Sequence, residues 1–151
     1  MNPSVLNECL TSEAQAIGIY EGECFILKRL PKTIQGRTLE MLLNEILHEE
    51  KGHLNALHPW QSNLSSGLRA SVHLNRVVGW CLGSILAFLP ARWIARVHIL
   101  GESAAAQIYK TAESALSSEA GSALCRELAH SAEQEEKHVR LFRNFLKESA
   151  L

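Results

Sequence analysis

Glutamate and histidine three residues apart recur four times in the sequence, as Glu45/His48, Glu50/His53, Glu127/His130 and Glu135/His138. Residues three or four positions apart share one face of a helix, so each pair could place a carboxylate and an imidazole beside one metal ion. Two pairs fall inside apolar series with helical spacing. The first series is Leu39, Leu43, Ile46, Glu50, His53, Leu57, and the second is Leu124, Leu128, Ser131, Glu135, His138, Phe142, Phe145. A carboxylate that faces a core is costly without a partner, and a bound cation is a common partner.

The other two pairs lie on polar series and are predicted to be solvated. Glu45/His48 share their series with Thr38, Met41, Gly52 and Asn55. Glu127/His130 share theirs with Ala123, Gln134 and Lys137. These two pairs are therefore not candidate ligands.

Two single glutamates stand in apolar series of their own. The series are Leu6, Leu10, Glu13, Ile17, Tyr20, Cys24, Leu27 and Ala95, Ile99, Glu102, Ala106, Tyr109, Leu116. A tyrosine follows each glutamate by seven residues, and a core-facing Glu-x-x-His pair comes later in each half of the chain. The halves therefore read as two similar helical hairpins about a pseudo-twofold axis, as in a bundle that holds two metal ions.

Four carboxylates and two imidazoles form an oxygen-rich ligand set, which suits iron or manganese better than structural zinc. We expect Glu50 and Glu135 to bridge two ions, with Glu13 and Glu102 as terminal ligands. Four negative charges balance two divalent cations, and a diferrous pair can pass two electrons to O₂. Oxygenases, ferroxidases and peroxide reductases all use this chemistry. A metal-free bundle of protonated carboxylates is the alternative, at a high cost of burial.

The elements that must position these residues are helices. Glycine and proline are sparse, and no period-two alternation predicts a strand, so the 151 residues are predicted to form one all-α domain. Proline and serine-rich stretches mark the helix ends. The expected helices cover residues 4 or 11 to 30, 38 to 57, 91 to 116 and 122 to 147, with turns at 31–37 and 117–122 and a loop at 58–68. A further helical pattern starts at residue 69.

Composition limits the partners. The chain carries 15 Lys and Arg against 16 Asp and Glu, so no basic face for a nucleic acid is expected. Cys9, Cys24, Cys81 and Cys125 are widely spaced, which indicates reduced thiols in a cytosolic protein. The N-terminus shows no basic-then-apolar leader, so no signal peptide is expected.

The stretch from residue 77 to 89 is strongly apolar but shorter than the roughly 20 residues that a spanning helix needs. It is either a core or dimer helix, or a surface that dips into a membrane and admits a lipid-soluble substrate. The candidate access residues are Val77, Trp80, Leu82, Ile85, Leu86, Phe88 and Trp93. The candidates for outer hydrogen-bond partners of the ligands are Tyr20, Tyr109 and His98.

Four stretches carry a resemblance to a known family. They are Glu13-Ala-Gln-Ala-Ile-Gly-Ile-Tyr20-Glu-Gly, His48-Glu-Glu50-Lys-Gly-His53-Leu, Gly79-Trp-Cys-Leu-Gly83-Ser-Ile-Leu-Ala-Phe-Leu and Glu135-Glu-Lys-His138. They resemble the ligand segments and the apolar helix of the demethoxyubiquinone hydroxylases, ferritin-like di-iron monooxygenases of ubiquinone biosynthesis. The sequence differs at Cys9-Leu-Thr-Ser12, where the family usually has Asp-His-Ala-Gly, and at Gly101, where it often has a second glutamate.

The resemblance implies a single ferritin-like di-iron domain over residues 1–151, a four-helix bundle with an additional apolar helix between its second and third helices. It implies metal ligands Glu13, Glu50, His53, Glu102, Glu135 and His138, two iron ions with manganese as the substitute, and O₂ as co-substrate. A reduced nicotinamide or another reductant would supply electrons. The substrate would be a demethoxylated ubiquinone precursor or a similar lipid-soluble quinone.

The resemblance also implies a peripheral location on the cytoplasmic side of a membrane, such as the bacterial inner membrane. A homo-oligomer or a partner from a biosynthetic complex would be a further contact. Two other functions compete. One is an iron-oxidising or peroxide-reducing protein of the ferritin or rubrerythrin type, and the other is a non-catalytic bundle that binds a lipid or a partner protein.

Overall fold

Five α-helices build the protein in a computed structural model that describes residues 3–31, 33–60, 66–116 and 123–149. They are α1 (Pro3–Leu27), α2 (Ile34–Leu57), α3 (Ser66–Leu86), α4 (Ala91–Leu116) and α5 (Ala123–Glu148), with a 3₁₀ turn at His58–Trp60. No strand occurs within these ranges, so the all-α prediction is confirmed for the described residues.

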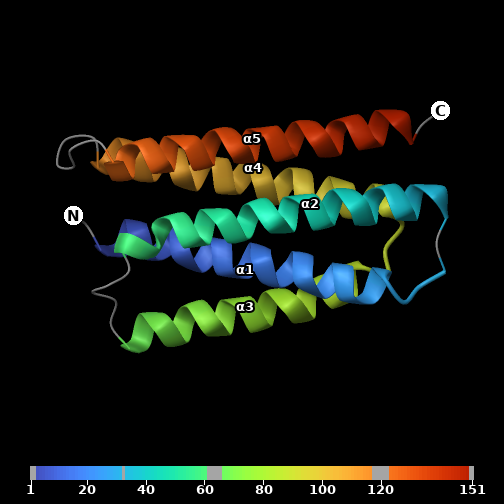
Figure 1. The fold of residues 1–151 in the computed structure, drawn as a ribbon, viewed down its shortest axis with the longest axis horizontal. Helices are drawn as coiled ribbons and strands as arrows, with labels where there is room; N and C mark the ends of the chain where they lie inside the picture. Colours follow the sequence, from blue (N-terminus) through green and yellow to red (C-terminus); the bar gives the residue numbers. More distant parts are fainter. Residues whose placement is uncertain (1–2, 32, 61–65, 117–122, 150–151) are drawn as a thin grey trace.

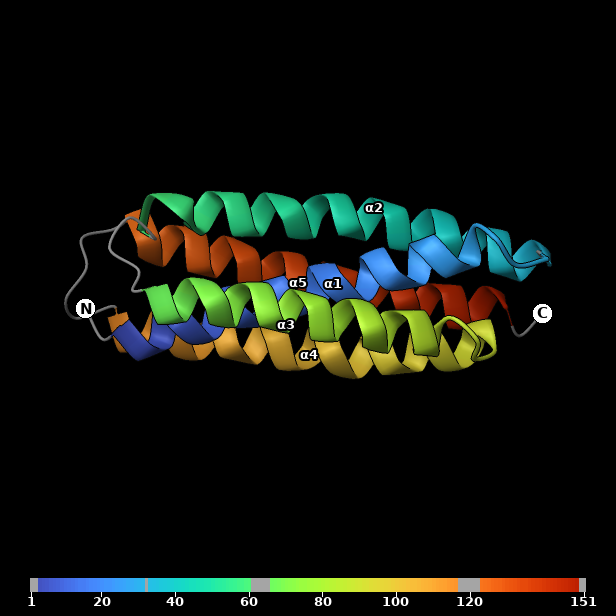
Figure 2. The same cartoon turned by 90° about the horizontal axis from the view of Figure 1, so that it is seen from below.

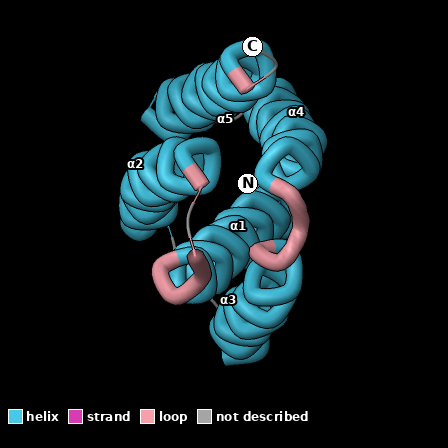
Figure 3. The backbone as a smooth tube through the Cα atoms, turned by 90° about the vertical axis from the view of Figure 1, so that its right-hand side faces the viewer, coloured by secondary structure: helices cyan, strands magenta, loops and turns pink. Residues whose placement is uncertain are grey.

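Helices α1, α2, α4 and α5 run side by side and enclose a common core, while α3 lies outside them along α1 (Figures 1 and 3). The chain reverses direction between α1 and α2 and between α4 and α5, which gives two antiparallel hairpins (Figure 1). The view from below shows α3 running along the length of the bundle in front of α1 (Figure 2), and α3 packs mainly on α1. The long connection through α3 is what brings the second hairpin back to the first.

Local chemistry shifts two helix ends from their expected places. Helix α2 begins at Ile34 rather than near residue 38, because the Thr33 hydroxyl caps it by accepting a hydrogen bond from the backbone N–H of Gly36 at 3.0 Å. Helix α1 ends at Leu27, before the expected residue 30, since the approach to Pro31 disfavours helical geometry. The expected loop at 58–68 is shorter at its end, where α3 starts at Ser66, and residues 61–65 lie outside the described part of the chain.

Two apolar clusters fill the bundle, one toward each end. One gathers residues such as Cys9, Leu57, Tyr109 and Ala112. The other gathers Tyr20, Leu39, Leu43, Phe142 and others at the opposite end. The layer between them contains the buried glutamates and histidines. The hydrophobic clusters therefore seal a polar centre from both ends.

Helix α3 attaches to α1 by close backbone contact. Its two buried residues are Gly79 and Gly83, which pack on the stretch of α1 that contains Gly18 and Gly22. A Cβ atom on Gly83 would lie 2.0 Å from the carbonyl oxygen of Ile19, and one on Gly18 would lie 2.1 Å from that of Arg76. Only glycine permits two helices to approach so closely. The paired Gly-x-x-x-Gly motifs thus fix α3 on the bundle.

Candidate metal centre

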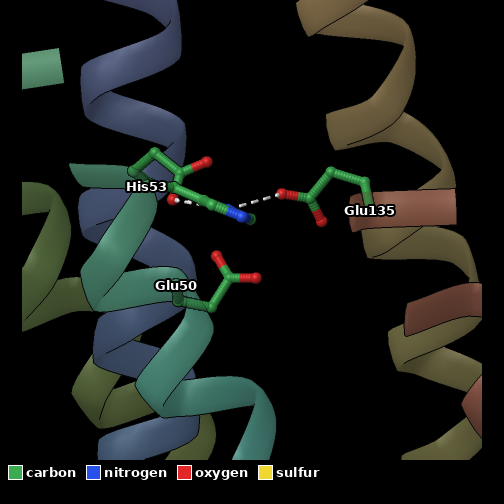
Figure 4. A group of neighbouring side chains, drawn as sticks. Glu50, His53 and Glu135 are labelled. Carbon is green, nitrogen blue, oxygen red and sulfur yellow. Dashed lines mark ion pairs between the residues drawn. The ribbon is translucent and has the colours of Figure 1, made fainter. Parts of the chain in front are cut away.

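Six side chains converge in the middle of the bundle, and all are buried. They are Glu13 from α1, Glu50 and His53 from α2, Glu102 from α4, and Glu135 and His138 from α5. Each was expected from the sequence to face the core, and the structure brings all six together. Figure 4 shows His53 and Glu50 on α2 facing Glu135 across the bundle.

The six side chains form two overlapping groups of four. One is Glu13, Glu50, His53 and Glu135, and the other is Glu50, Glu102, Glu135 and His138. Within each group one potential ligand atom per residue lies within 4.8 Å of the others. Glu50 and Glu135 belong to both groups. This sharing is the arrangement that two bridging carboxylates require.

Both histidines point their Nδ1 atoms into the cluster. His53 Nδ1 lies 3.3 Å from Glu135 Oε1 and 3.9 Å from Glu13 Oε2 (Figure 4). His138 Nδ1 lies 3.2 Å from Glu102 Oε2 and 3.3 Å from Glu50 Oε1. The Nδ1 atoms are therefore the ones that could bind metal.

Several buried atoms in this cluster make no hydrogen bond to any described residue. They are Glu13 Oε2, Glu50 Oε1, His53 Nδ1 and both carboxylate oxygens of Glu135. Unpaired buried polar atoms are rare in folded proteins because desolvation costs about 1–3 kcal/mol for each. These atoms turn toward a common centre, and most of them are carboxylate oxygens. This donor set fits iron or manganese.

The pKa values of the carboxyl groups show how crowded the centre is. Burial, together with the neighbouring Glu135, raises the pKa of Glu50 to about 8. Burial and nearby glutamates also raise the pKa values of Glu13 and Glu135 well above the ordinary range. Burial pushes the pKa of Glu102 upward too, but the hydrogen bond with His138, together with nearby His98, outweighs burial and lowers that pKa to about 2. Such a group of carboxylates needs positive charge to ionise fully.

The two tyrosines hold the two single glutamates, each across the bundle. The Tyr20 hydroxyl on α1 donates a hydrogen bond to Glu102 on α4. The Tyr109 hydroxyl on α4 donates one to Glu13 on α1. Burial and the adjacent carboxylates raise the pKa of both hydroxyl groups well above 10, which keeps them protonated as donors.

His98 lies beside the centre and is paired with a residue that the sequence did not indicate. His98 Nε2 lies 2.7 Å from Glu23 Oε2, and both side chains are buried. The Nδ1 atom of His98 lies 3.9 Å from Glu102 Oε1. Glu23 comes three residues after Tyr20, a spacing that places it on the same side of α1, but it stands outside the apolar series.

Glu49 is a second residue that was not predicted. Its Oε2 atom lies 3.0 Å from His138 Nε2, and Lys137 Nζ lies 2.7 Å from its Oε1. A histidine that binds metal through one nitrogen usually donates its other N–H to a carboxylate, which fixes the ring. The signal in the sequence was the adjacent pair Glu49-Glu50, of which only the second follows the apolar series. The pairs Glu45/His48 and Glu127/His130 stay outside the centre, with Glu45, His48 and His130 exposed, as expected.

A pocket of about 220 Å³ reaches the centre between α1 and α4. Its lining includes Ala16 and Ile19 from α1 and Gly101 and Ala105 from α4, together with the polar residues Ser12 and Gln15. Glu13, Glu50, Glu102 and Glu135 line its inner part. The pocket gives a small molecule a route to the glutamates.

Most of the large hydrophobic side chains that the described structure exposes lie between Leu74 and Leu100, on α3 and the first half of α4. Among the candidate access residues, Val77, Trp80, Leu82, Ile85, Phe88 and Trp93 are exposed, and Leu86 is half-buried. Among the described helices, none combines the length and the apolar character that crossing a membrane requires.

The comparison with curated proteins found no match, and neither did the comparison with solved structures. The comparison with protein families found one match, which covers residues 91–151 and so includes α4 and α5. This match covers Glu102, Glu135 and His138, half of the buried cluster. Residues 91–151 match the family model described as ubiquinone biosynthesis protein COQ7, and the resemblance seen in the sequence is confirmed over that part of the chain.

Proposed function

We propose that the protein is a ferritin-like di-iron, O₂-dependent monooxygenase that hydroxylates a demethoxylated ubiquinone precursor or a similar lipid-soluble quinone. The observation that carries the proposal is the buried cluster of four glutamates and two histidines, arranged as two groups that share Glu50 and Glu135. The match of residues 91–151 to a ubiquinone biosynthesis family supports the choice of substrate.

Glu13 and His53 would hold one metal ion, Glu102 and His138 the other, and Glu50 and Glu135 would bind both. When bound, two ferrous ions would supply the two electrons that O₂ activation needs. Tyr20 and Tyr109 would keep the two terminal carboxylates oriented. Each hydroxyl already donates to its carboxylate, so the geometry is set before a metal binds.

The pocket between α1 and α4 would admit the quinone ring, since Ala16, Ile19, Gly101 and Ala105 leave room beside the glutamates. The exposed apolar residues of α3 and α4 would rest on the cytoplasmic surface of a membrane, where a long-tailed quinone is dissolved. This apolar surface favours a lipid-soluble substrate over an iron-storage or peroxide-scavenging role. A reduced nicotinamide or another reductant would return the irons to the ferrous state.

The test is mass spectrometry of a demethoxylated quinol after incubation with iron-loaded protein, a reductant and O₂. We expect a product heavier by one oxygen atom with the wild-type chain and none with Glu135→Ala, which removes a shared ligand. The matched control is Glu133→Ala, which removes an exposed carboxylate two residues away on α5 and should leave the product unchanged.

If two irons bind to each chain and no product forms, the quinone assignment is wrong. Rapid oxidation of ferrous iron, with many irons taken up by each chain, would then favour the ferritin-type function. Hydroxylation that persists in Glu135→Ala would show that the reaction does not depend on the buried cluster.

A further inference from the structure

Several buried positions in the two halves of the bundle hold similar residues, and one pair of buried positions differs in charge. The shift in residue number that relates Glu13 to Glu102 also relates Tyr20 to Tyr109. The shift that relates Glu50 to Glu135 also relates His53 to His138 and Leu57 to Phe142. The same shift pairs Leu39 and Leu43 of one apolar cluster with Leu124 and Leu128 of the other.

The difference lies at His98 and Glu23. By the shift that relates Glu13 to Glu102, Cys9 is the counterpart of His98 and Ala112 is the counterpart of Glu23. Cys9 and Ala112 both belong to the apolar cluster at their end of the bundle. At the other end, the two positions hold an imidazole and a carboxylate 2.7 Å apart, both buried.

A buried ion pair seldom stabilises a fold more than apolar residues of similar size would. The counterpart end shows that the bundle packs well with Cys9 and Ala112 at these positions. The Glu23–His98 pair is therefore not needed to fill the core. One oxygen of Glu23 makes no hydrogen bond to any described residue, which adds to the free energy needed to bury this carboxylate.

The surroundings of His98 hold its ring in one place. The ring stacks between Tyr20, at 4.5 Å between centroids, and Phe142, at 4.8 Å. Glu23 fixes the Nε2 edge, so the Nδ1 edge faces Glu102. The imidazole is therefore fixed beside the terminal carboxylate, with His98 Nδ1 3.9 Å from Glu102 Oε1.

We infer that Glu23 and His98 are positioning residues for Glu102, and that they make the two metal positions unequal. The inference rests on the metal centre proposed above and extends it. The position built from Glu102 and His138 has a terminal carboxylate that accepts a hydrogen bond from Tyr20 and is flanked by His98. In the position built from Glu13 and His53, Tyr109 donates the equivalent hydrogen bond, and Cys9 stands where the other position has His98. Preorganised ligands bind metal more tightly, so the Glu102 position fills first.

Glu49 adds to the same inequality. It contacts Nε2 of His138, whereas the residue at the counterpart position, before Glu135, is Gln134. A carboxylate partner makes a histidine a stronger ligand. The two differences between the halves, the Glu23–His98 pair and Glu49, therefore favour the same metal position.

The double variant Glu23→Ala/His98→Cys tests the inference, because it installs the residues found at the counterpart positions. Metal-free protein would be titrated with Mn²⁺, and protein loaded with ⁵⁷Fe²⁺ would be examined by Mössbauer spectroscopy without O₂. For the wild type we expect two binding steps and two quadrupole doublets of equal area. In the double variant the Mn²⁺ affinity of the first step should fall by about 10-fold or more. The quadrupole splittings of the two doublets should become more alike but stay distinct, because Glu49 still contacts only one of the two histidines.

His48→Cys, which removes an exposed histidine from α2, is the control and should keep both steps and both doublets. Glu23→Gln provides a milder change that preserves a hydrogen bond to His98, and we expect a smaller shift in the same direction. This variant decides the question if the double variant does not fold.

The outcomes separate the two proposals. A wild-type chain that binds no ions overturns the metal centre, and this inference with it. Two ions bound in equal steps, or a first step and doublets that stay unchanged in the double variant and in Glu23→Gln, overturn only the role of Glu23 and His98.

Discussion

At the scale of single residues, Tyr20 and Tyr109 tie the two hairpins together through the centre itself. Each hydroxyl lies on one hairpin and donates to a carboxylate on the other. Both rings are fully buried, so water cannot replace either donor. The orientation of Glu13 and Glu102 therefore depends on two residues outside the cluster of four glutamates and two histidines.

We expect Tyr20→Phe and Tyr109→Phe each to lower the free energy of unfolding by about 1–3 kcal/mol, because a buried acceptor loses its donor. Each should also weaken Mn²⁺ binding by about 10–100-fold, since the carboxylate is no longer held. Denaturant unfolding and a metal titration measure the two effects. A loss of stability with unchanged affinity would mean that the tyrosines only fill the core.

The buried carboxyl groups predict how the metal-free chain responds to pH. The pKa values of Glu13, Glu50 and Glu135 are raised by burial, that of Glu50 from 4.5 to about 8. The folded state therefore binds more protons than the unfolded state, and stability falls as pH rises toward 8. The lowered pKa of His53 opposes this trend near pH 6.5, where the unfolded ring loses its proton, and the raised pKa values of His98 and His138 reinforce the trend.

Between pH 6.5 and 8, Glu50 alone should reduce the free energy of unfolding by about 1.5 kcal/mol. Thermal unfolding of chelator-treated protein at the two pH values measures this change. Two equivalents of Mn²⁺ should abolish the difference, since bound cations keep the carboxylates ionised. A metal-free chain that is more stable at pH 8 would contradict the expected ionisation of the centre.

At the scale of the helices, periodicity in the sequence identified the central residues and missed their supports. The series that contain Glu13, Glu50, Glu102 and Glu135 repeat at helical spacing, and the structure buries all four. Glu23 and Glu49 lie at the flanks of such series, where a buried and a solvated carboxylate look alike. Their roles depend on His98 and His138, which come from other helices, so only tertiary packing reveals them.

The attachment of α3 predicts a contrast between two glycines. Gly83→Ala should cost about 1–3 kcal/mol of stability, because the new Cβ would lie 2.0 Å from the backbone oxygen of Ile19 and α3 must move away. Gly52→Ala should stabilise α2 by up to about 1 kcal/mol, since no atom lies within 4 Å of the new methyl group.

Thermal unfolding measures both glycine variants, and a metal titration should find two ions per chain in each, because α3 supplies none of the six side chains. Loss of metal from Gly83→Ala alone would show that α3 shapes the centre as well as the outer surface.

At the scale of the whole molecule, the centre and the apolar surface of α3 and α4 should work together. Ile85 is 68% exposed on α3. Ile85→Glu should weaken binding to phospholipid vesicles by about 10-fold or more, because burial of one such side chain contributes about 1.5–3 kcal/mol. Turnover of a water-soluble short-tailed quinol should be unchanged.

Vesicle sedimentation and a turnover assay measure these two effects. The matched control is Ile34→Glu, which makes the same change at a residue that is 83% exposed at the start of α2. Equal vesicle binding by both variants and the wild type would argue that the α3 surface contacts a protein instead.

The division of the six side chains between the two hairpins also sets the order of events during synthesis. The first hairpin leaves the ribosome with Glu13, Glu50 and His53, and the other half of the centre does not yet exist. Glu135 and His138 lie on α5, so they arrive only after the second hairpin has been made. The raised pKa values of Glu13, Glu50 and Glu135 mean that the metal-free bundle folds with protons on these carboxyl groups. If the proposed iron centre forms, iron would therefore bind only after both hairpins have folded together.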